Sequence, residues 1–255
     1  MYTNHIDSRF FRIISLKMCF FNPNPNKEKE TTPSPTPTLP IPKVPFWEIE
    51  VNEENEEKEK ITWIELYQHL FLGRFIFLGK PIDAQSTTHI VKSMIHLDQQ
   101  DAEMNFKFFM HCRGGSLIGG ISVYDVMQYV TGDVTTVGVG LNASAGAFML
   151  HGGTVGKRFI GKHGRAMIHQ PFVAIFEKRR VRLTVEDAQY MNHLRNYVAE
   201  IYARNLRLSP DRMYGKIERD VHLTSKQALH VGLVDKVLDK DKLKDIIADT
   251  RKNPS

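Results

Sequence analysis

The chain has 255 residues, of which 42% are hydrophobic and 25% charged, a balance typical of one sizeable α/β domain with additional segments. No apolar run reaches about 18 residues, which argues against a membrane-spanning helix, and two cysteines, Cys19 and Cys112, are too few for a disulfide framework. The net charge of +5 and the pI near 9.1 do not indicate nucleic-acid binding, because the sequence contains no zinc-finger or RNA-binding motif.

Residues 1–60 do not have the pattern of a packed domain. Proline recurs through residues 22–26 and 31–38, and residues 53–57 form an acidic run. We therefore expect an N-terminal extension that is disordered or mobile. The short apolar stretch at residues 10–21 is interrupted by basic residues and fits either an import leader or an unstructured tail, of which we favour the tail.

Regular patterns begin at Ile61, and apolar residues at helical spacing predict a short helix over residues 63–70. Beyond it, apolar runs alternate with amphipathic stretches, which is the pattern of a largely parallel sheet in an α/β fold. The predicted strands are residues 75–79, 106–110, 134–139, 158–160, 166–169 and 234–238. The predicted helices are residues 84–97 and 118–130, a short one from Ser144, and residues 184–206 with Thr184 as N-cap. The expected domain spans residues 61–240, followed by a basic C-terminal tail at residues 241–255.

Ser144 lies where a predicted strand changes to a helix, among the small residues Ala143, Ala145 and Gly146. Free backbone N–H groups at a helix start can stabilise an oxyanion, and small neighbours let a substrate approach closely. A nucleophilic serine fits this position, and so does a small residue that serves tight helix packing. The G-x-S-x-G pattern of α/β-hydrolases is absent from the sequence.

His169 ends a predicted strand and is a candidate general base for Ser144, although a core histidine with satisfied nitrogens would fit there too. A third residue has to orient the imidazole, and spacing leaves Asp220, Asp211 and Asp235 open. The histidines and cysteines show no spacing typical of a metal site. We therefore expect no metal in this chain.

The Gly114-Gly115 turn follows the predicted strand at residues 106–110 and opens the next helix. Glycines leave the backbone N–H groups of such a turn uncovered, so that they can face an oxyanion. A simple tight turn between a strand and a helix would use the same two glycines. Both interpretations stay open on the local sequence.

Seven motifs occur in one order along the chain: Gly114-Gly115, Tyr124–Gln128, Gly140–Phe148, Lys157–Phe159, Met167–Pro171, Glu218–Asp220 and Gly232–Asp235. Together they resemble the ClpP family, the proteolytic subunits of ATP-dependent Clp protease, over roughly residues 63–238. Each motif alone is weak, but their ordered combination is highly specific. Two segments, Pro42–Phe46 and Glu218–Val221, are most similar to the plastid version of the family.

The resemblance implies a ClpP/crotonase-like fold of repeated strand-helix units with a protruding helical handle. It also implies a serine endopeptidase that hydrolyses peptide bonds of unfolded polypeptides. The family's triad falls on Ser144, His169 and Asp220. Its oxyanion hole falls on the backbone N–H groups of Gly115 and Ala145.

The same resemblance implies rings of seven related Clp proteolytic subunits stacked as a tetradecamer, and an AAA+ unfoldase that uses ATP while this chain holds no cofactor. The helix at residues 184–206 would be the handle that joins the rings, which would explain an apolar stripe without a partner in its own domain. The implied location is the chloroplast stroma, with neither nucleic acid nor membrane as partner. Because the family's N-terminus lines the axial pore, we expect the extension to be removed near Pro42.

The chain departs from the family at three places. Cys112-Arg113 stands where the family usually has Ser-Pro, so we expect a less rigid oxyanion turn. Ala145 replaces the usual Met, which changes the packing beside Ser144 but keeps the N–H group. Residues 172–182 are bulky and basic instead of Gly-rich, and the basic run at residues 178–182 predicts a preference for acidic peptides.

Two alternatives remain beside the serine endopeptidase. A catalytically weak structural subunit of the same ring would explain the departures at residues 112 and 113, although the retained triad residues argue against it. A crotonase-like acyl-CoA enzyme would share the fold and a glycine-based oxyanion hole. That enzyme class would not need the three triad residues together, and the sequence shows no carboxylate pair suited to hydratase chemistry.

Overall fold

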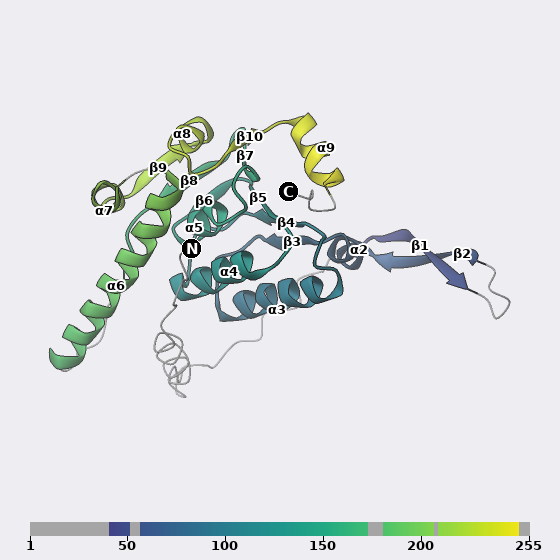
Figure 1. Ribbon diagram of the computed structural model, residues 1–255, viewed down its shortest axis with the longest axis horizontal. Helices are drawn as coiled ribbons and strands as arrows, with labels where there is room; N and C mark the ends of the chain where they lie inside the picture. Colours follow the sequence, from purple (N-terminus) through teal and green to yellow (C-terminus); the bar gives the residue numbers. More distant parts are fainter. Residues whose placement is uncertain (1–40, 52–56, 173–180, 207–208, 250–255) are drawn as a thin grey trace, which may run out of the picture. The chain divides into compact units, whose positions relative to one another are not determined.

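The computed structural model describes residues 41–51, 57–172, 181–206 and 209–249 (Figure 1). Its main sheet has five parallel strands in the order β10-β7-β5-β4-β3. These strands are β3 (Phe75–Leu78), β4 (Phe106–Met110), β5 (Val134–Gly138), β7 (Arg158–Gly161) and β10 (Lys236–Leu238). The predicted α/β fold with a largely parallel sheet is therefore confirmed.

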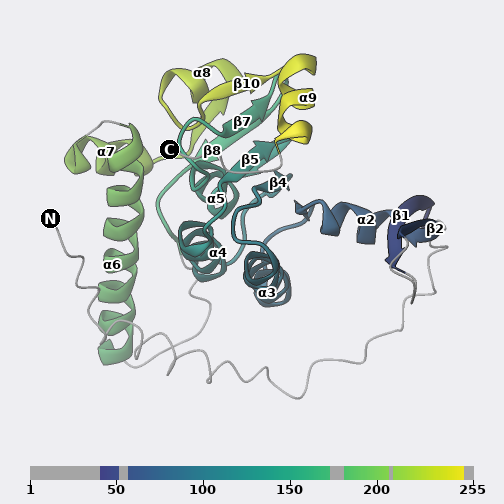
Figure 2. The same cartoon turned by 45° about the vertical axis from the view of Figure 1, so that its right-hand side comes forward.

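Helices cover the sheet on both faces. On one side, α3 (Ala84–Gln100), α4 (Leu117–Tyr129) and α5 (Ala145–His151) lie next to one another (Figure 2). Side chains alternate between the two faces of a strand, and Phe108 faces the large core with these helices, whereas its neighbour Phe109 belongs to a second cluster. In that second cluster, Ile246 of α9 (Lys240–Ala248) packs with Val137 and Phe159. The described part of the segment expected as a basic tail is thus mostly a packed helix, because Ile246 is buried against the sheet.

A second sheet has three strands in the order β6-β8-β9: β6 (Leu141–Ala143), β8 (Arg165–Ile168) and β9 (Val221–Thr224). Strand β6 runs parallel to β8, and β8 runs antiparallel to β9. The sequence pattern did not predict β6 as a separate strand, because its residues follow closely after the apolar run of the preceding strand. Gly140, with a φ of +64°, separates the two strands and redirects the chain into the second sheet.

The chain enters the main sheet through a hairpin of β1 (Lys43–Val51) and β2 (Glu57–Glu65), followed by α2 (Leu66–Leu72). The helix predicted over residues 63–70 is therefore wrong in its first turn. Trp63 lies on β2 opposite Pro45, because pairing with β1 satisfies backbone groups that a helix would otherwise use. The domain boundaries at residues 60 and 240 stay a prediction.

Helix α6 (Val181–Leu206) is the expected handle helix, and α7 (Pro210–Ile217) packs against it. Thr184 lies inside α6, so its predicted role as N-cap is wrong: the preceding Val-Arg-Leu contains no helix breaker, and the helix extends through it. The apolar stripe of α6 was also expected to lack a partner in the domain, which is wrong for its C-terminal half. Leu194, Val198 and Ile201 are buried in the large core, whereas Ala188 is exposed. None of the described helices, α6 included, is long and apolar enough to cross a membrane.

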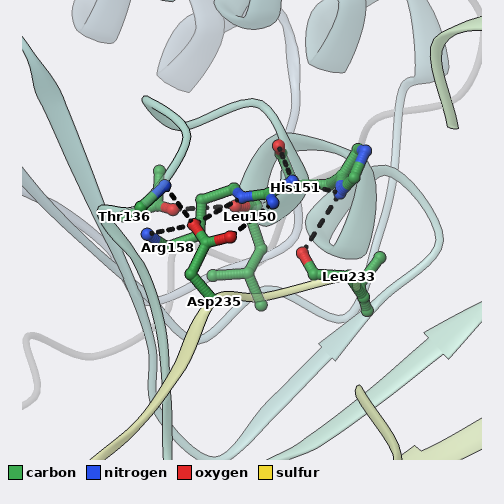
Figure 3. A network of polar contacts seen from close by, with 7 residues as sticks. Thr136, Leu150, His151, Arg158, Leu233 and Asp235 are labelled. Carbon is green, nitrogen blue, oxygen red and sulfur yellow. Dashed lines mark hydrogen bonds and ion pairs between the residues drawn. The ribbon is translucent and has the colours of Figure 1, made fainter. Parts of the chain in front are cut away.

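A buried polar network ties β7 to the segment that follows α8 (Ser225–His230) (Figure 3). The Arg158 guanidinium donates from Nη2 to Asp235 Oδ1 at 2.6 Å and from Nε to Asp235 Oδ2 at 2.8 Å. Burial raises the pKa of Asp235, but the hydrogen bonds and the charge of Arg158 outweigh burial and lower it overall. The pair fixes the last strand of the main sheet beside β7.

His151 extends this network into α5 (Figure 3). Its Nδ1 lies 3.1 Å from the Leu233 carbonyl oxygen and 3.0 Å from Arg158 Nη1, and its buried Nε2 has no partner among the residues that the structure describes. Complete burial, followed by the charge of Arg158, lowers the pKa of His151 to about 4. The imidazole is therefore neutral in the folded protein at neutral pH.

We expect this histidine to make stability depend on pH. The unfolded chain binds a proton on His151 below its ordinary pKa of 6.5, whereas the folded chain does so near 4, so the free energy of unfolding falls as the pH drops through that window. The loss should be roughly 3 kcal/mol. Urea unfolding at a series of pH values checks it. The profile should flatten in His151→Leu and persist in His89→Leu, an exposed histidine on α3; equal slopes in both variants would contradict the prediction.

Candidate active site

The second sheet gathers three chain segments at one edge. Ser144 directly follows β6, His169 directly follows β8, and Asp220 directly precedes β9. Parallel β6 and β8 end at the same edge, and antiparallel β9 begins there. The pairing of these short strands therefore brings together three residues that are 25 and 51 positions apart in the chain.

The three side chains form one chain of hydrogen bonds. Ser144 Oγ lies 2.8 Å from His169 Nε2, and His169 Nδ1 lies 3.0 Å from Asp220 Oδ1. Because a carboxylate only accepts, Nδ1 carries the proton and Nε2 is left to accept the serine hydroxyl. The imidazole is 19% exposed and the carboxylate 63%. In this tautomer the histidine can take a proton from the hydroxyl.

The other two aspartates that spacing left open lie elsewhere. Asp235 is paired with Arg158 in the buried network, and Asp211 lies exposed in the first turn of α7. The structure thus places Asp220 against His169 and neither of the alternatives. Sequence spacing could not make this choice, because the choice depends on which strand pairs with β8.

Ser144 has an unusual backbone conformation, with a φ of +54° and a ψ of −122°. Such conformations cost about 1–3 kcal/mol for a residue with a side chain. Two backbone hydrogen bonds hold it: its N–H donates to the Met167 carbonyl at 2.8 Å, and its carbonyl accepts from the Phe148 N–H at 3.0 Å. The sequence predicted a serine between a strand and a helix, but it gave no signal for this strain.

The Gly114-Gly115 turn is fixed through Ile82. The Ile82 N–H donates to the Gly114 carbonyl at 2.8 Å, and the Ser116 N–H donates to the Ile82 carbonyl at 2.9 Å. Both glycines have a positive φ, +107° and +130°. Within the described part of the chain, the N–H groups of Gly115 and Ala145 donate no hydrogen bond. Hydrogen bonds on both sides of Gly115 restrain the turn, and the loss of rigidity expected without the family's proline stays a prediction.

Cys112 packs beneath this turn and is fully buried. Its N–H donates to Asn142 Oδ1 at 3.3 Å, and its carbonyl accepts from the Ala143 N–H at 2.9 Å. Burial raises the pKa of its thiol, so the thiolate is disfavoured. Asn142, which the sequence analysis did not single out, thereby joins β6 to the turn.

Replacing Gly115 with alanine should displace the turn. A Cβ there would lie 2.2 Å from the Ile82 carbonyl oxygen, and the φ of +130° is unfavourable for any side chain. We expect peptide hydrolysis to fall about tenfold to hundredfold, because a displaced N–H group stabilises an oxyanion poorly. Steady-state kinetics at equal concentrations of folded protein measure the loss. Gly79→Ala, where a Cβ meets nothing within 4 Å, is the matched control, and equal activities of the two variants would refute the prediction.

A cleft of about 560 Å³ opens beside Ser144 and His169. Apolar side chains from α4, α5 and α6 form most of its lining, among them Leu117, Ile118, Phe148, Met191, Leu194 and Val198. Residues 173–180, which include most of the basic run expected to favour acidic peptides, lie outside the described residues. In the described ranges, no three histidine, cysteine or acidic side chains gather as metal ligands would.

Comparison with known proteins shows which family this chain is similar to. The family model for Clp protease matches residues 56–241. A protein named "ATP-dependent Clp protease proteolytic subunit" from Oenothera elata subsp. hookeri is 38% identical over 196 residues, which are 77% of this chain and 78% of the relative. Proteins of the same name match from Vitis vinifera, at 34% over 77% of this chain and 96% of the relative, and from Staurastrum punctulatum, at 33% over 71% and 89%.

Proposed function

This chain belongs to the Clp protease family, and from that premise we propose that it is a serine endopeptidase, the proteolytic subunit of an ATP-dependent Clp protease. One observation carries the proposal: Ser144, His169 and Asp220 form a continuous hydrogen-bonded chain at the rim of an apolar cleft. No observation favours the structural subunit or the acyl-CoA enzyme.

In the proposed reaction, Ser144 Oγ attacks the scissile carbonyl carbon while His169 Nε2 takes its proton. The carbonyl oxygen becomes an oxyanion, which the N–H groups of Gly115 and Ala145 stabilise. His169 then donates the proton to the leaving amine, and Asp220 stabilises the charged imidazole in between. Water attacks the acyl-enzyme by the same steps and releases the acid product, so that atoms and protons balance over the cycle.

The proposal includes the assembly in which this site would work. The subunit would take its place with related Clp proteolytic subunits in heptameric rings stacked as a tetradecamer, and would receive unfolded polypeptides from an AAA+ unfoldase that uses ATP. The chain itself would hold no cofactor, and the assembly would be in the chloroplast stroma. Removal of the N-terminal extension near Pro42 belongs to the same proposal, and the intact mass of the native subunit tests it.

A fluorophosphonate probe tests the activity directly. The probe reacts with activated serine hydroxyls, and peptide mapping should find it on Ser144 in the assembled full-length protein. Labelling should be lost in His169→Ala, because this variant has no imidazole to take the hydroxyl proton. An intact assembly whose Ser144 stays unlabelled would contradict the proposal and favour a structural subunit.

A further inference from the structure

The cleft beside Ser144 contains one permanently charged side chain among its described lining residues, Arg113. A guanidinium stays protonated at every relevant pH. The described lining contains no acidic side chain, and apart from Arg113, Ser144, Ser116 and His169 it is built of apolar residues, tyrosines and one glycine. Arg113 is itself exposed. An anionic group that enters the cleft would therefore meet a positive charge and no opposing negative charge in this lining.

Among the residues that the structure describes, Arg113 has no partner that would give its side chain a structural role. It makes no hydrogen bond or ion pair with any residue in the described ranges, in contrast to Arg158, which Asp235 holds in the core. The turn beside it is fixed through Ile82 by backbone groups and does not use the Arg113 side chain. With respect to the described residues, all five guanidinium N–H donors are therefore available to a ligand.

The backbone at Arg113 lies close to the reacting groups. It directly precedes Gly114, whose site for a Cβ is 3.6 Å from Ser144 Oγ, and it stands two residues before the free N–H of Gly115. A peptide whose scissile carbonyl reaches Ser144 therefore lies close to the backbone of Arg113, and the Arg113 side chain lines the same cleft. A carboxylate next to that carbonyl would accept charge-assisted hydrogen bonds from the guanidinium. An amide side chain of the same shape carries no charge and would lack this contribution.

We propose that Arg113 is a specificity-determining residue that favours peptides with a glutamate or aspartate beside the scissile bond. The inference rests on the proposed endopeptidase function and adds a substrate class to it. It is separate from the preference expected of the basic run at residues 178–182, because it depends on a described side chain at the rim of the cleft.

Matched fluorogenic peptides test it on the assembled full-length protein. Each pair carries glutamate or glutamine at the same position, placed in turn on either side of the scissile bond, and the readout is the glutamate-to-glutamine ratio of kcat/KM. This ratio does not depend on how much of a variant is active. In the wild type we expect a ratio of about three to five at the favoured position, the range of an exposed ion pair. It should fall close to one in Arg113→Gln, stay intermediate in Arg113→Lys, and keep its wild-type value in Arg212→Gln, an exposed arginine of α7 outside the cleft.

Salt provides a test without any variant. Raising NaCl from about 0.1 M to about 1 M shortens the screening length from about 10 Å to 3 Å and should lower the wild-type ratio. A wild-type ratio near one at both positions, or a raised ratio that Arg113→Gln retains, overturns the inference while leaving the proposed function intact. A protein that neither cleaves any peptide nor reacts with the fluorophosphonate probe overturns both.

Discussion

Replacing Ser144 with alanine should lower kcat for peptide hydrolysis by about five to six orders of magnitude, because the alanine removes the atom that attacks the carbonyl. The free N–H groups of Gly115 and Ala145 would remain, so a small rate above the uncatalysed reaction should persist. The fold should be retained, since the backbone bonds to Met167 and Phe148 hold the strained conformation without the hydroxyl. Alanine has no more difficulty than serine at a φ of +54°.

Peptide hydrolysis by assembled Ser144→Ala, compared with Ser122→Ala, measures this effect. Ser122 lies on α4, donates to the Ile118 carbonyl and is absent from the cleft lining. It therefore controls for the loss of a hydroxyl as such. Retention of more than about one hundredth of the wild-type kcat in Ser144→Ala would contradict the proposed nucleophile. In a mixed ring, every copy of this chain must carry the substitution, because the activity of wild-type copies would mask the loss.

Asp235→Ala should lower the free energy of unfolding by about 3–5 kcal/mol. The carboxylate accepts from Arg158 at 2.6 and 2.8 Å and also from the Gly156 N–H at 2.7 Å, and the Arg158 side chain is only 4% exposed. Removing the carboxylate leaves a buried charge without its counter-ion. This lowers the stability of the fold more than replacing both members of the pair would. Asp235→Asn should be affected less, because the amide oxygen still accepts a hydrogen bond.

Chemical unfolding at neutral pH compares this variant with Asp239→Ala, whose carboxylate bonds Lys242 at the surface. The surface variant should lose much less, since water screens its pair. The lowered pKa of Asp235 also sets a pH dependence: its carboxylate stabilises the fold above the ordinary pKa of 3.8, and this contribution disappears as the pH falls below that value. Equal losses in the two variants would show that burial of Arg158 does not govern the effect.

Local sequence patterns were sufficient to predict most of the fold class. The alternation of apolar runs with helix-length stretches predicted β4 and α4 closely, because β4 is apolar at every position except Lys107 and α4 is predominantly apolar, as buried elements must be. The errors fell where local preference and tertiary pairing compete. Trp63 fits a helix by spacing but lies on β2, and Thr184 is a good N-cap residue but lies inside α6.

For the active site, local sequence was enough to predict the available chemistry: a serine among small residues, a histidine at a strand end, a glycine turn and three candidate aspartates. Which aspartate meets His169 could not be predicted this way, because it depends on β9 pairing with β8. The same holds for the burial of the C-terminal half of α6 in its own domain. The reason is the same in both cases: side-chain periodicity shows that a face must be covered, but contacts between distant segments determine what covers it.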